Sequence, residues 1–390
     1  MTNSSDRPYL PHAFSDIIPD RVEARGAEDY DQRDEGISPR RLPAWTRLQV
    51  PKLMDVIVRM PSGVRLRFAT DSRRVGVSFH ATNMVTSPQE RRPITFNLET
   101  SGTVLKAQSR AGNAIHLDRP KPGEFDLVRG EADTLWFEDL PVGENTCELW
   151  LPHNAFLELR ALHLDADASL ALPAPDLRPR WLHYGSSISH CMEADEPAYT
   201  WPAVAARLAG ANLQSLGFGG QCHLDGFVAR TIRDSDADVI SLKVGINVIN
   251  MDSMRERVFV SALHAFVDTI REGRPDTPIV LISPIYCPSA EQSPGPTLPN
   301  KDGKFVTVAG DERLREGCLT LERTRELISA VVAARSDAGD EQLSYLDGLG
   351  LFGERDAGDL PDDLHPNAAG YVRMGERFAP VLSNVIQGLS

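Results

Sequence analysis

Residues 46–170 carry an alternating pattern of apolar and polar positions. In "GVRLRFAT", "VGVSFHAT" and "PITFNLET", every second residue is apolar, and Gly, Pro, Asp and Asn separate such segments. A period of two is typical of strands that bury one face. Many short strands without a convincing helix predict an all-β, jelly-roll-like sandwich domain over residues 46–170. Residues 1–45 are polar and rich in charge clusters such as "EDYDQRDE", so we expect a polar N-terminal arm there.

A different pattern begins at residue 181. Continuous runs of Val, Ile and Leu, such as "DVISLKVG" and "PIVLISPIY", alternate with segments of helical periodicity such as "TWPAVAARLA". Apolar strands of this kind indicate a parallel sheet that is covered by helices on both faces. Five strand and helix units predict a three-layer α/β/α domain with a five-stranded parallel sheet over residues 181–390. The proline-rich stretch 171–180 between the two patterns predicts a linker.

Residues 287–317 do not follow this alternation. They form a long stretch after the fourth predicted strand, with several prolines and glycines and no clear periodicity. A loop of this length in a compact domain is more often functional than idle. We predict that residues 287–317 cover the substrate.

Composition and charge narrow the classes of function. The formal net charge of −14 argues against a nucleic acid or an anionic membrane as a partner, because phosphate binding depends on clustered Lys and Arg. The five cysteines contain no C-x-x-C pair, so they indicate neither a disulfide framework nor a structural zinc site. The N-terminal residues do not resemble a signal peptide, and no run is long enough to cross a bilayer. We therefore expect a cytoplasmic protein that acts on small molecules, and the sequence leaves its oligomeric state open.

The first candidate residues for catalysis follow the first and last strands of the predicted sheet. Ligands bind at the carboxyl ends of parallel strands. Gly185 permits a tight turn after the first strand, and Ser187 can then point into the crevice. A serine hydroxyl is a weak nucleophile that needs a base, and the base needs a carboxylate to orient it. Asp362 and His365 have a spacing that lets the carboxylate reach one imidazole nitrogen while the other faces the serine, and Pro366 indicates that both lie at a helix start.

Two further segments offer donors for a developing oxyanion. Gly220 can direct its backbone N–H at the oxyanion, and Asn247 can donate its side-chain amide. Each has a simpler alternative. The glycines around Gly220 approach a dinucleotide-binding fingerprint, but Cys222 stands where its third glycine is needed. Asn247 alone would be a loop asparagine that satisfies its own turn. His183 lies inside the first predicted strand, so we interpret it as a structural residue and not as a catalytic one.

As a set, these segments resemble the SGNH or GDSL hydrolase family over about residues 180–388. The family is named for the Ser, Gly, Asn and His of four such segments, which match Ser187, Gly220, Asn247 and His365. Asp362 stands where the family has its acid. The resemblance implies a catalytic triad of Ser187, Asp362 and His365. It also implies an oxyanion hole made by the N–H groups of Ser187 and Gly220 and the amide of Asn247, with no metal or cofactor.

Two positions depart from the family pattern. Ser186 replaces the Asp of "GDS", and Val248 follows the asparagine where an Asp is common. Neither position belongs to the triad, so we expect altered turn support without loss of chemistry.

The domain order is similar to that of a smaller group in this family, which contains a salicylyl acyltransferase of tetracycline-type antibiotic biosynthesis, and to that of the two-domain carbohydrate esterases. It implies acyl transfer through an acyl-serine. We favour an O-acyltransferase that moves an acyl or aroyl group from a thioester, such as acyl-CoA, to a hydroxyl of a natural product. A GDSL esterase acting on a small-molecule or carbohydrate ester and a non-catalytic carbohydrate-binding protein remain as alternatives. The expected partners are a small-molecule acyl donor and a hydroxyl acceptor, with an acyl carrier protein as a further candidate.

Overall fold

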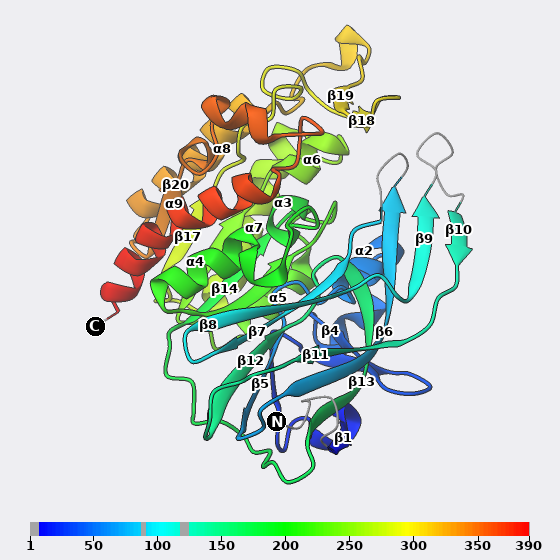
Figure 1. The fold of residues 1–390 in the computed structure, drawn as a ribbon. Coiled ribbons are helices and arrows are strands. Elements are labelled where there is room, and N and C mark those ends of the chain that lie inside the picture. The colour runs from blue at the N-terminus through cyan, green and yellow to red at the C-terminus, as the bar shows by residue number, and fades with distance from the viewer. Residues whose placement is uncertain (1–7, 87–90, 118–124, 390) are drawn as a thin grey trace. The chain divides into compact units, whose positions relative to one another are not determined.

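The chain divides into two compact units (Figure 1). The computed structural model describes residues 8–86, 91–117 and 125–389. The sandwich unit comprises residues 1–44, 58–176 and 195–198, and the α/β unit comprises residues 45–57, 177–194 and 199–390. The division between residues 176 and 177 falls in the proline-rich stretch.

The sandwich unit is built from two sheets. Within the described residues, the larger sheet follows the order β10-β9-β6-β13-β4-β3, with β1 paired to β13 and β11 to β6. Its strands are β1 (Tyr9–Ala13), β3 (Asp29–Gln32), β4 (Ile37–Arg40), β6 (Val75–Thr86), β9 (Asn113–Leu117), β10 (Phe125–Val128), β11 (Asp133–Phe137) and β13 (Ala155–Asp165). The smaller sheet has the order β2-β5-β12-β7-β8. Its strands are β2 (Glu23–Arg25), β5 (Arg65–Thr70), β7 (Ile94–Thr100), β8 (Thr103–Ser109) and β12 (Asn145–Trp150).

The core of the sandwich lies between these sheets. Alternate residues of β5, β6, β7 and β12 point inward, and Phe79 of the larger sheet meets Phe96 of the smaller one with ring centroids 4.9 Å apart. In β13 the alternation shifts at a β-bulge between Leu159 and Ala161, so that Leu159 and Leu162 both face the core. These observations confirm the predicted sandwich.

The N-terminal residues differ from the polar arm that the sequence predicts. Strands β1 to β4 and the short helix α1 (Phe14–Ile17) all lie within residues 8–44 and belong to the sandwich unit. A few apolar side chains among many polar ones, including those of Phe14, Ile17 and Ile37, are buried in its core. Strands of three to five residues contain few apolar positions, so composition alone does not reveal them.

The α/β unit contains the predicted parallel sheet. Its strand order is β15-β14-β16-β17-β20, and every pair is parallel. The strands are β14 (Arg180–Gly185), β15 (Asn212–Gly217), β16 (Val239–Lys243), β17 (Ile279–Ile282) and β20 (Leu343–Leu346). The helices are α2 (Lys52–Val58), α3 (Ser187–His190), α4 (Trp201–Ala209), α5 (Gly226–Arg233), α6 (Ile246–Asn250), α7 (Glu256–Gly273), α8 (Leu321–Asp337) and α9 (Ala368–Gln387).

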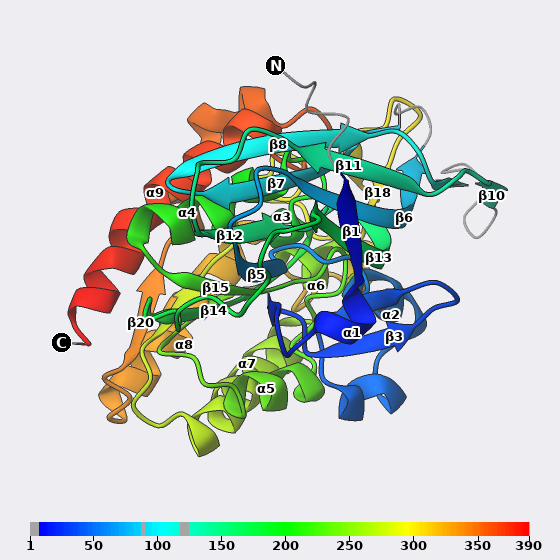
Figure 2. The same cartoon turned by 60° about the horizontal axis from the view of Figure 1, so that its bottom comes forward.

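Helices cover both faces of this sheet, as Figure 2 shows for α4 and α9 on one face and α5 and α7 on the other. On the first face, the ring of Trp181 in β14 stacks on Phe378 of α9 at a centroid distance of 5.3 Å. On the second face, Tyr184 of the same strand stacks on Phe266 of α7, also at 5.3 Å. The three-layer architecture is therefore confirmed. The residues after β14, β15 and β16 leave the sheet at its carboxyl edge.

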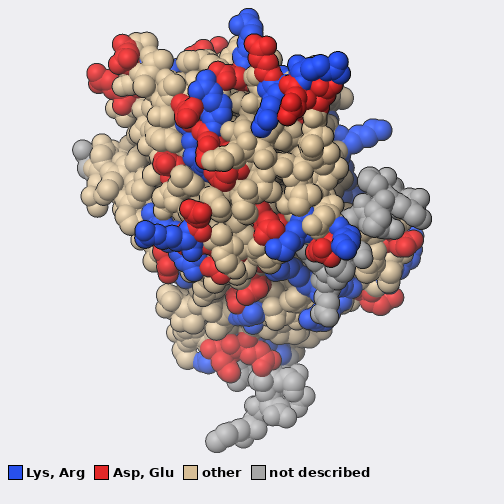
Figure 3. Space-filling model, turned by 90° about the horizontal axis from the view of Figure 1, so that it is seen from above, with Lys and Arg blue, Asp and Glu red and all other residues tan. Residues whose placement is uncertain are grey.

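Charged side chains of both signs are mixed on the surface that Figure 3 shows. Lys and Arg lie among Asp and Glu there, so the negative net charge does not come from a single acidic patch on this face. In the part of the chain that the structure describes, no helix has the length and apolar character needed to cross a membrane.

Candidate active site

Three of the predicted residues meet at the carboxyl edge of the parallel sheet. Ser187 begins α3 directly after β14, whereas Asp362 and His365 lie in the turn that precedes α9. His365 Nε2 is 2.8 Å from Ser187 Oγ, and His365 Nδ1 is 2.8 Å from Asp362 Oδ2. Both imidazole nitrogens are thus engaged, which fixes the orientation of the ring between a hydroxyl and a carboxylate.

Asp362 also folds the turn that carries the histidine. Its Oδ1 accepts the backbone N–H of Leu364 at 3.1 Å and that of His365 at 2.7 Å. Burial favours a raised pKa for Asp362, but the hydrogen bonds and charge of His365 and the backbone N–H groups outweigh it and lower the pKa below its usual value. The carboxylate is therefore ionised at neutral pH.

This turn differs from the helix start that the sequence predicts for Asp362 and His365. Helix α9 begins at Ala368, where Asn367 caps it by accepting the N–H of Gly370 at 2.9 Å. Asp362 and His365 lie before the helix because the Asp362 side chain accepts the backbone N–H groups of Leu364 and His365, which favours a turn over a helix.

The turn that presents Ser187 is packed tightly against β14. A Cβ at Gly185 would lie 2.2 Å from Ser189 Oγ, so glycine is required where α3 folds back on the strand. Ser186, which stands where the related family has Asp, caps α3 by accepting the N–H of Ile188 at 3.3 Å. The serine therefore still supports the turn.

His183, in β14, supports the same turn. Its two ring nitrogens lie 2.7 Å from Ser241 Oγ and 2.7 Å from Ser189 Oγ. Complete burial, followed by the charge of Lys243, lowers the pKa of His183 to about 3, so the ring is neutral and joins β14, β16 and α3. These contacts agree with the structural role predicted from the sequence.

The predicted oxyanion donors follow β15 and β16. Gly220 has a left-handed φ of +67°, and Asn247 in α6 is 4% exposed. Asn247 Oδ1 accepts the N–H of Cys222 at 3.0 Å, which sets the orientation of the side-chain amide. Within the described residues, neither the N–H of Ser187 or Gly220 nor Nδ2 of Asn247 donates to an acceptor. All three donors are therefore available to a ligand.

The predicted covering segment contains a short antiparallel hairpin of β18 (Thr297–Pro299) and β19 (Phe305–Thr307). We call residues 297–307 the hairpin. The N–H of Phe305 donates to the carbonyl of Asp362 at 2.9 Å, and its ring meets the imidazole of His365 edge-on at a centroid distance of 5.7 Å. Lys304 pairs with Asp363 at 3.1 Å. The hairpin is thus attached directly to the turn that carries Asp362 and His365.

Just before the hairpin, Gly295 lies against α6. A Cβ at this position would be 1.7 Å from the carbonyl oxygen of Ile249, so only glycine allows the approach. The segment therefore touches both the helix that carries Asn247 and the turn that carries His365.

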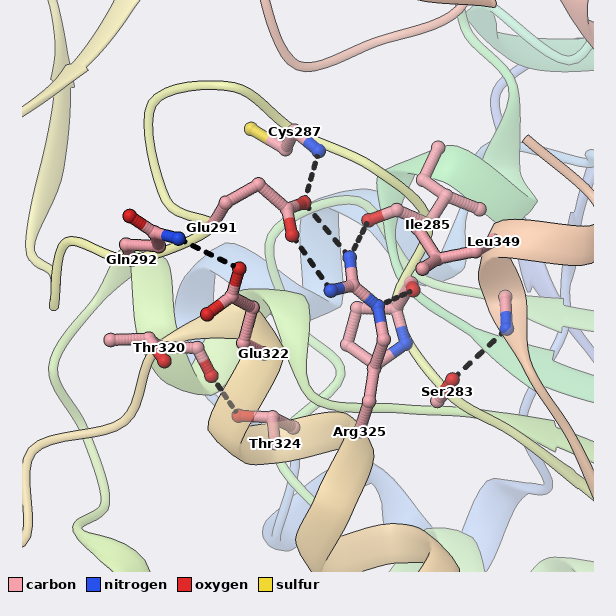
Figure 4. A network of polar contacts seen from close by, with 12 residues as sticks. Ser283, Ile285, Cys287, Glu291, Gln292, Thr320, Glu322, Thr324, Arg325 and Leu349 are labelled. Atoms are coloured by element: carbon pink, nitrogen blue, oxygen red, sulfur yellow. Dashed lines mark hydrogen bonds and ion pairs between the residues drawn. The ribbon is translucent and has the colours of Figure 1, made fainter. Parts of the chain in front are cut away.

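A buried ion pair anchors the start of this segment (Figure 4). Arg325 of α8 pairs with both carboxylate oxygens of Glu291, at 2.7 and 2.8 Å, and donates to the carbonyls of Pro284 and Ile285. Glu291 in turn accepts the N–H of Cys287 at 2.9 Å. Because every polar group of the pair has a partner, the base of the segment is rigidly fixed to α8.

Two cysteines and a histidine near the site have surroundings that do not activate them as nucleophile or base. Burial raises the pKa of the Cys222 thiol to about 12 and that of Cys191 well above its usual value, so neither is a thiolate at neutral pH. His223 hydrogen-bonds Ser253 and the carbonyl of Gly220. The described residues contain no cluster of three or more His, Cys, Asp or Glu side chains that could hold a metal ion.

Sequence reasoning did not find two neighbours of His365. Phe305 lies in the segment that the sequence predicts to cover the substrate, but no pattern singles out its ring. Glu193 places Oε1 3.9 Å from His365 Nδ1. It lies in a polar loop after α3 with no distinctive spacing, so no sequence signal identifies it.

Comparisons with known proteins cover both units. The profile of the GDSL-like Lipase/Acylhydrolase family matches residues 183–373, and that of the SsfX3 N-terminal domain matches residues 22–160. The solved structure of the Salicylyl-Acyltransferase SsfX3 from a Tetracycline Biosynthetic Pathway is 29% identical with a TM-score of 0.79, and the match covers 97% of this chain and 98% of that chain. A search of curated proteins gave no match.

More distant structures share the fold. A family two carbohydrate esterase from Clostridium thermocellum, in complex with cellohexaose, is 15% identical with a TM-score of 0.59 over 94% of this chain and 100% of that chain. One from Cellvibrio japonicus is 14% identical with a TM-score of 0.58 over 98% of this chain and 99% of that chain. The chain is therefore an enzyme in which a GDSL-like lipase/acylhydrolase domain, over residues 183–373, follows an SsfX3-type N-terminal domain, over residues 22–160.

Proposed function

We propose that this enzyme transfers an acyl or aroyl group from a thioester to a hydroxyl of a natural product, through an acyl-serine on Ser187. The observation that carries the proposal is the chain of two 2.8 Å contacts from Ser187 through His365 to Asp362. A hydroxyl in this arrangement can be deprotonated as it attacks a carbonyl. The same chain argues against a purely carbohydrate-binding role.

In the first half-reaction, Ser187 Oγ attacks the thioester carbonyl while His365 Nε2 takes its proton. Asp362 holds the other imidazole nitrogen and stabilises the imidazolium that forms. The N–H groups of Ser187 and Gly220 and the amide of Asn247 are the proposed donors to the tetrahedral oxyanion. When the C–S bond breaks, the proton passes from His365 to the leaving thiolate. No metal or cofactor takes part in this scheme.

In the second half-reaction, the acceptor hydroxyl takes the place of the thiol. His365 removes its proton as the oxygen attacks the acyl-serine, and the proton then returns to Ser187 Oγ as the new ester leaves. CoA or an acyl carrier protein would supply the thioester. Water in place of the alcohol would give an esterase, so the two reactions differ only in the second nucleophile.

Two observations favour transfer over hydrolysis. The likeness to a salicylyl acyltransferase extends over 97% of this chain at 29% identity, whereas the carbohydrate esterases are only 14% to 15% identical. A transferase must also keep water from the acyl-serine. The hairpin packs Phe305 against the base, and the buried Arg325 to Glu291 pair fixes the segment that carries it. We propose that residues 287–317 shield the acyl-serine from water.

Intact-protein mass spectrometry tests this proposal. We expect acyl and aroyl thioesters to add one acyl mass to the enzyme, with the group mapped by peptide analysis to Ser187 rather than to Ser186 or Ser189. A panel of alcohols should discharge the adduct faster than water does and should yield an ester. Discharge at the same rate with and without every alcohol would identify an esterase instead. A lack of adduct with both thioesters and nitrophenyl esters would contradict acyl-serine chemistry altogether.

Replacing Phe305 by alanine should shift the balance toward hydrolysis. Loss of the ring opens space beside the imidazole, so water can approach the acyl-serine, and we expect the ratio of ester to free acid to fall roughly 10-fold. Product analysis at a fixed alcohol concentration measures this ratio. Val306→Ala is the matched control, because Val306 is 40% exposed and points to the opposite face of β19. Equal ratios in wild type and both variants would rule out the shielding role.

A further inference from the structure

A second carboxylate lies beside the imidazole of His365. Glu193 Oε1 is 3.9 Å from His365 Nδ1, the nitrogen that already binds Asp362 at 2.8 Å. This distance is too long for a hydrogen bond but short for an interaction between charges. The Glu193 side chain is 24% exposed and that of His365 is 12% exposed, so water screens the interaction only in part.

The position of Glu193 is set by two structural elements. Cys191 ends α3 in a left-handed conformation, with φ +61°, and its carbonyl accepts the N–H of Ala194, which turns the chain back toward the site. The hydroxyl of Tyr371 in α9 donates to Glu193 Oε2 at 2.8 Å and leaves Oε1 toward His365. Burial, followed by the charge of Glu193, raises the pKa of Tyr371 well above its usual value, so the phenol remains a donor.

We propose that Glu193 is a positioning residue that holds a second negative charge against His365. The inference rests on the proposed function and deepens it, because the imidazolium forms when Ser187 loses its proton. Two carboxylates then stabilise the imidazolium instead of one. The Glu193 carboxylate also lies close enough to stabilise a positive charge at Nδ1 when Asp362 is replaced.

Several other polar and ionisable groups of the described residues lie around His365. Asp362 is ionised at neutral pH because its pKa is lowered, and Tyr371 is protonated. On the hairpin side, Lys304 is paired with Asp363, and the neighbouring ring is that of Phe305. From α3, Ser187 contributes a hydroxyl, and burial raises the pKa of the following Cys191. The acidic limb of the reaction rate therefore reports the imidazole and the charges that act on it.

The test is the pH dependence of the reaction with diisopropyl fluorophosphate, which needs no knowledge of the natural substrate. Ser187 Oγ forms a bond to phosphorus, fluoride leaves with the P–F bond pair, and His365 takes the serine proton. For Glu193→Gln we expect the midpoint of the acidic limb to fall by about half to one pH unit, because loss of a negative charge lowers the pKa of the imidazolium. The plateau rate should fall roughly 3- to 10-fold.

Two further variants test whether the shift comes from Glu193 itself. Tyr371→Phe removes only the hydroxyl that holds Glu193, so it should move the limb in the same direction by a smaller amount. Asp195→Asn removes a negative charge two residues along the chain, from a side chain that is 72% exposed, and should leave the limb in place. Thermal melting of all variants checks that they fold.

A double-mutant comparison separates positioning from general charge effects. Glu193→Gln should lower the reaction rate by a larger factor in an Asp362→Asn background than in wild type, because Asp362 then no longer stabilises the imidazolium. The inference would be overturned if Glu193→Gln left the midpoint of the acidic limb unchanged and lowered the rate by the same factor in both backgrounds. A wild-type enzyme that does not react with the fluorophosphate would instead remove the proposed function, and the inference with it.

Discussion

Ser187→Ala will form no covalent acyl adduct and will lose roughly 10⁴- to 10⁶-fold in kcat. The variant lacks the oxygen that would carry the acyl group, and His365 would have no hydroxyl to deprotonate. Donors that bind the oxyanion remain, so residual catalysis above the uncatalysed reaction is expected. Intact-protein mass spectrometry with acyl thioesters and steady-state rates measure both effects.

Ser186→Ala is the matched control for this substitution. Ser186 is the neighbouring serine, and its Oγ accepts the N–H of Ile188 rather than contacting the imidazole. Loss of this cap should cost about 1 kcal/mol of stability but should still permit an adduct on Ser187. An adduct of full stoichiometry on Ser187→Ala would show that a different residue is the nucleophile.

The sequence was most informative about the parallel sheet, because its buried strands read as continuous apolar runs between helical segments. Parallel strands place their carboxyl ends along one edge of the sheet, so candidate catalytic residues are expected in the segments that follow them. Ser187 follows β14 directly, and the long connection from β20 to α9 brings His365, 178 residues later, to within 2.8 Å of it. Residue types in the segments after the strands therefore predicted that Ser187, Asp362 and His365 meet, without any knowledge of distances.

Other features depend on contacts that no local pattern encodes. Glu193 and Phe305 reach His365 from a short polar loop and a hairpin, and neither segment has a periodicity that points to the site. The sequence predicts the first turn of a helix around Asp362, since an acid, a histidine and a proline suit both a helix start and a turn. The side chain decides between them by bonding the backbone of Leu364 and His365.

Asp362→Asn will lower kcat roughly 10³- to 10⁴-fold while the turn stays folded. The asparagine Oδ1 can still accept the N–H groups of Leu364 and His365, as the carboxylate does at 3.1 and 2.7 Å. Its amide nitrogen, however, would face His365 Nδ1 as a donor. The proton would then reside on Nε2, which could no longer accept the proton of Ser187.

The dependence of stability on pH provides a second readout for the same substitution. Because the folded-state pKa of Asp362 lies below the value of 3.8 that an aspartate has in the unfolded chain, its ionised form contributes stability above that pH. This contribution disappears as the pH falls through the folded-state pKa, and the asparagine variant should lack it. Urea unfolding of both proteins between about pH 2 and 6 measures the difference.

Asp362→Ala separates the two tasks of this carboxylate. Alanine removes both the partner of Nδ1 and the acceptor for the two backbone N–H groups, so this variant should unfold more easily than Asp362→Asn. If Asp362→Asn kept nearly full activity, orientation of the imidazole would not require this carboxylate. Glu193, whose Oε1 lies 3.9 Å from Nδ1, would then be the candidate acid, and the activity should collapse when Glu193→Gln is added. Survival of the double variant would exclude an acid-assisted base at this site.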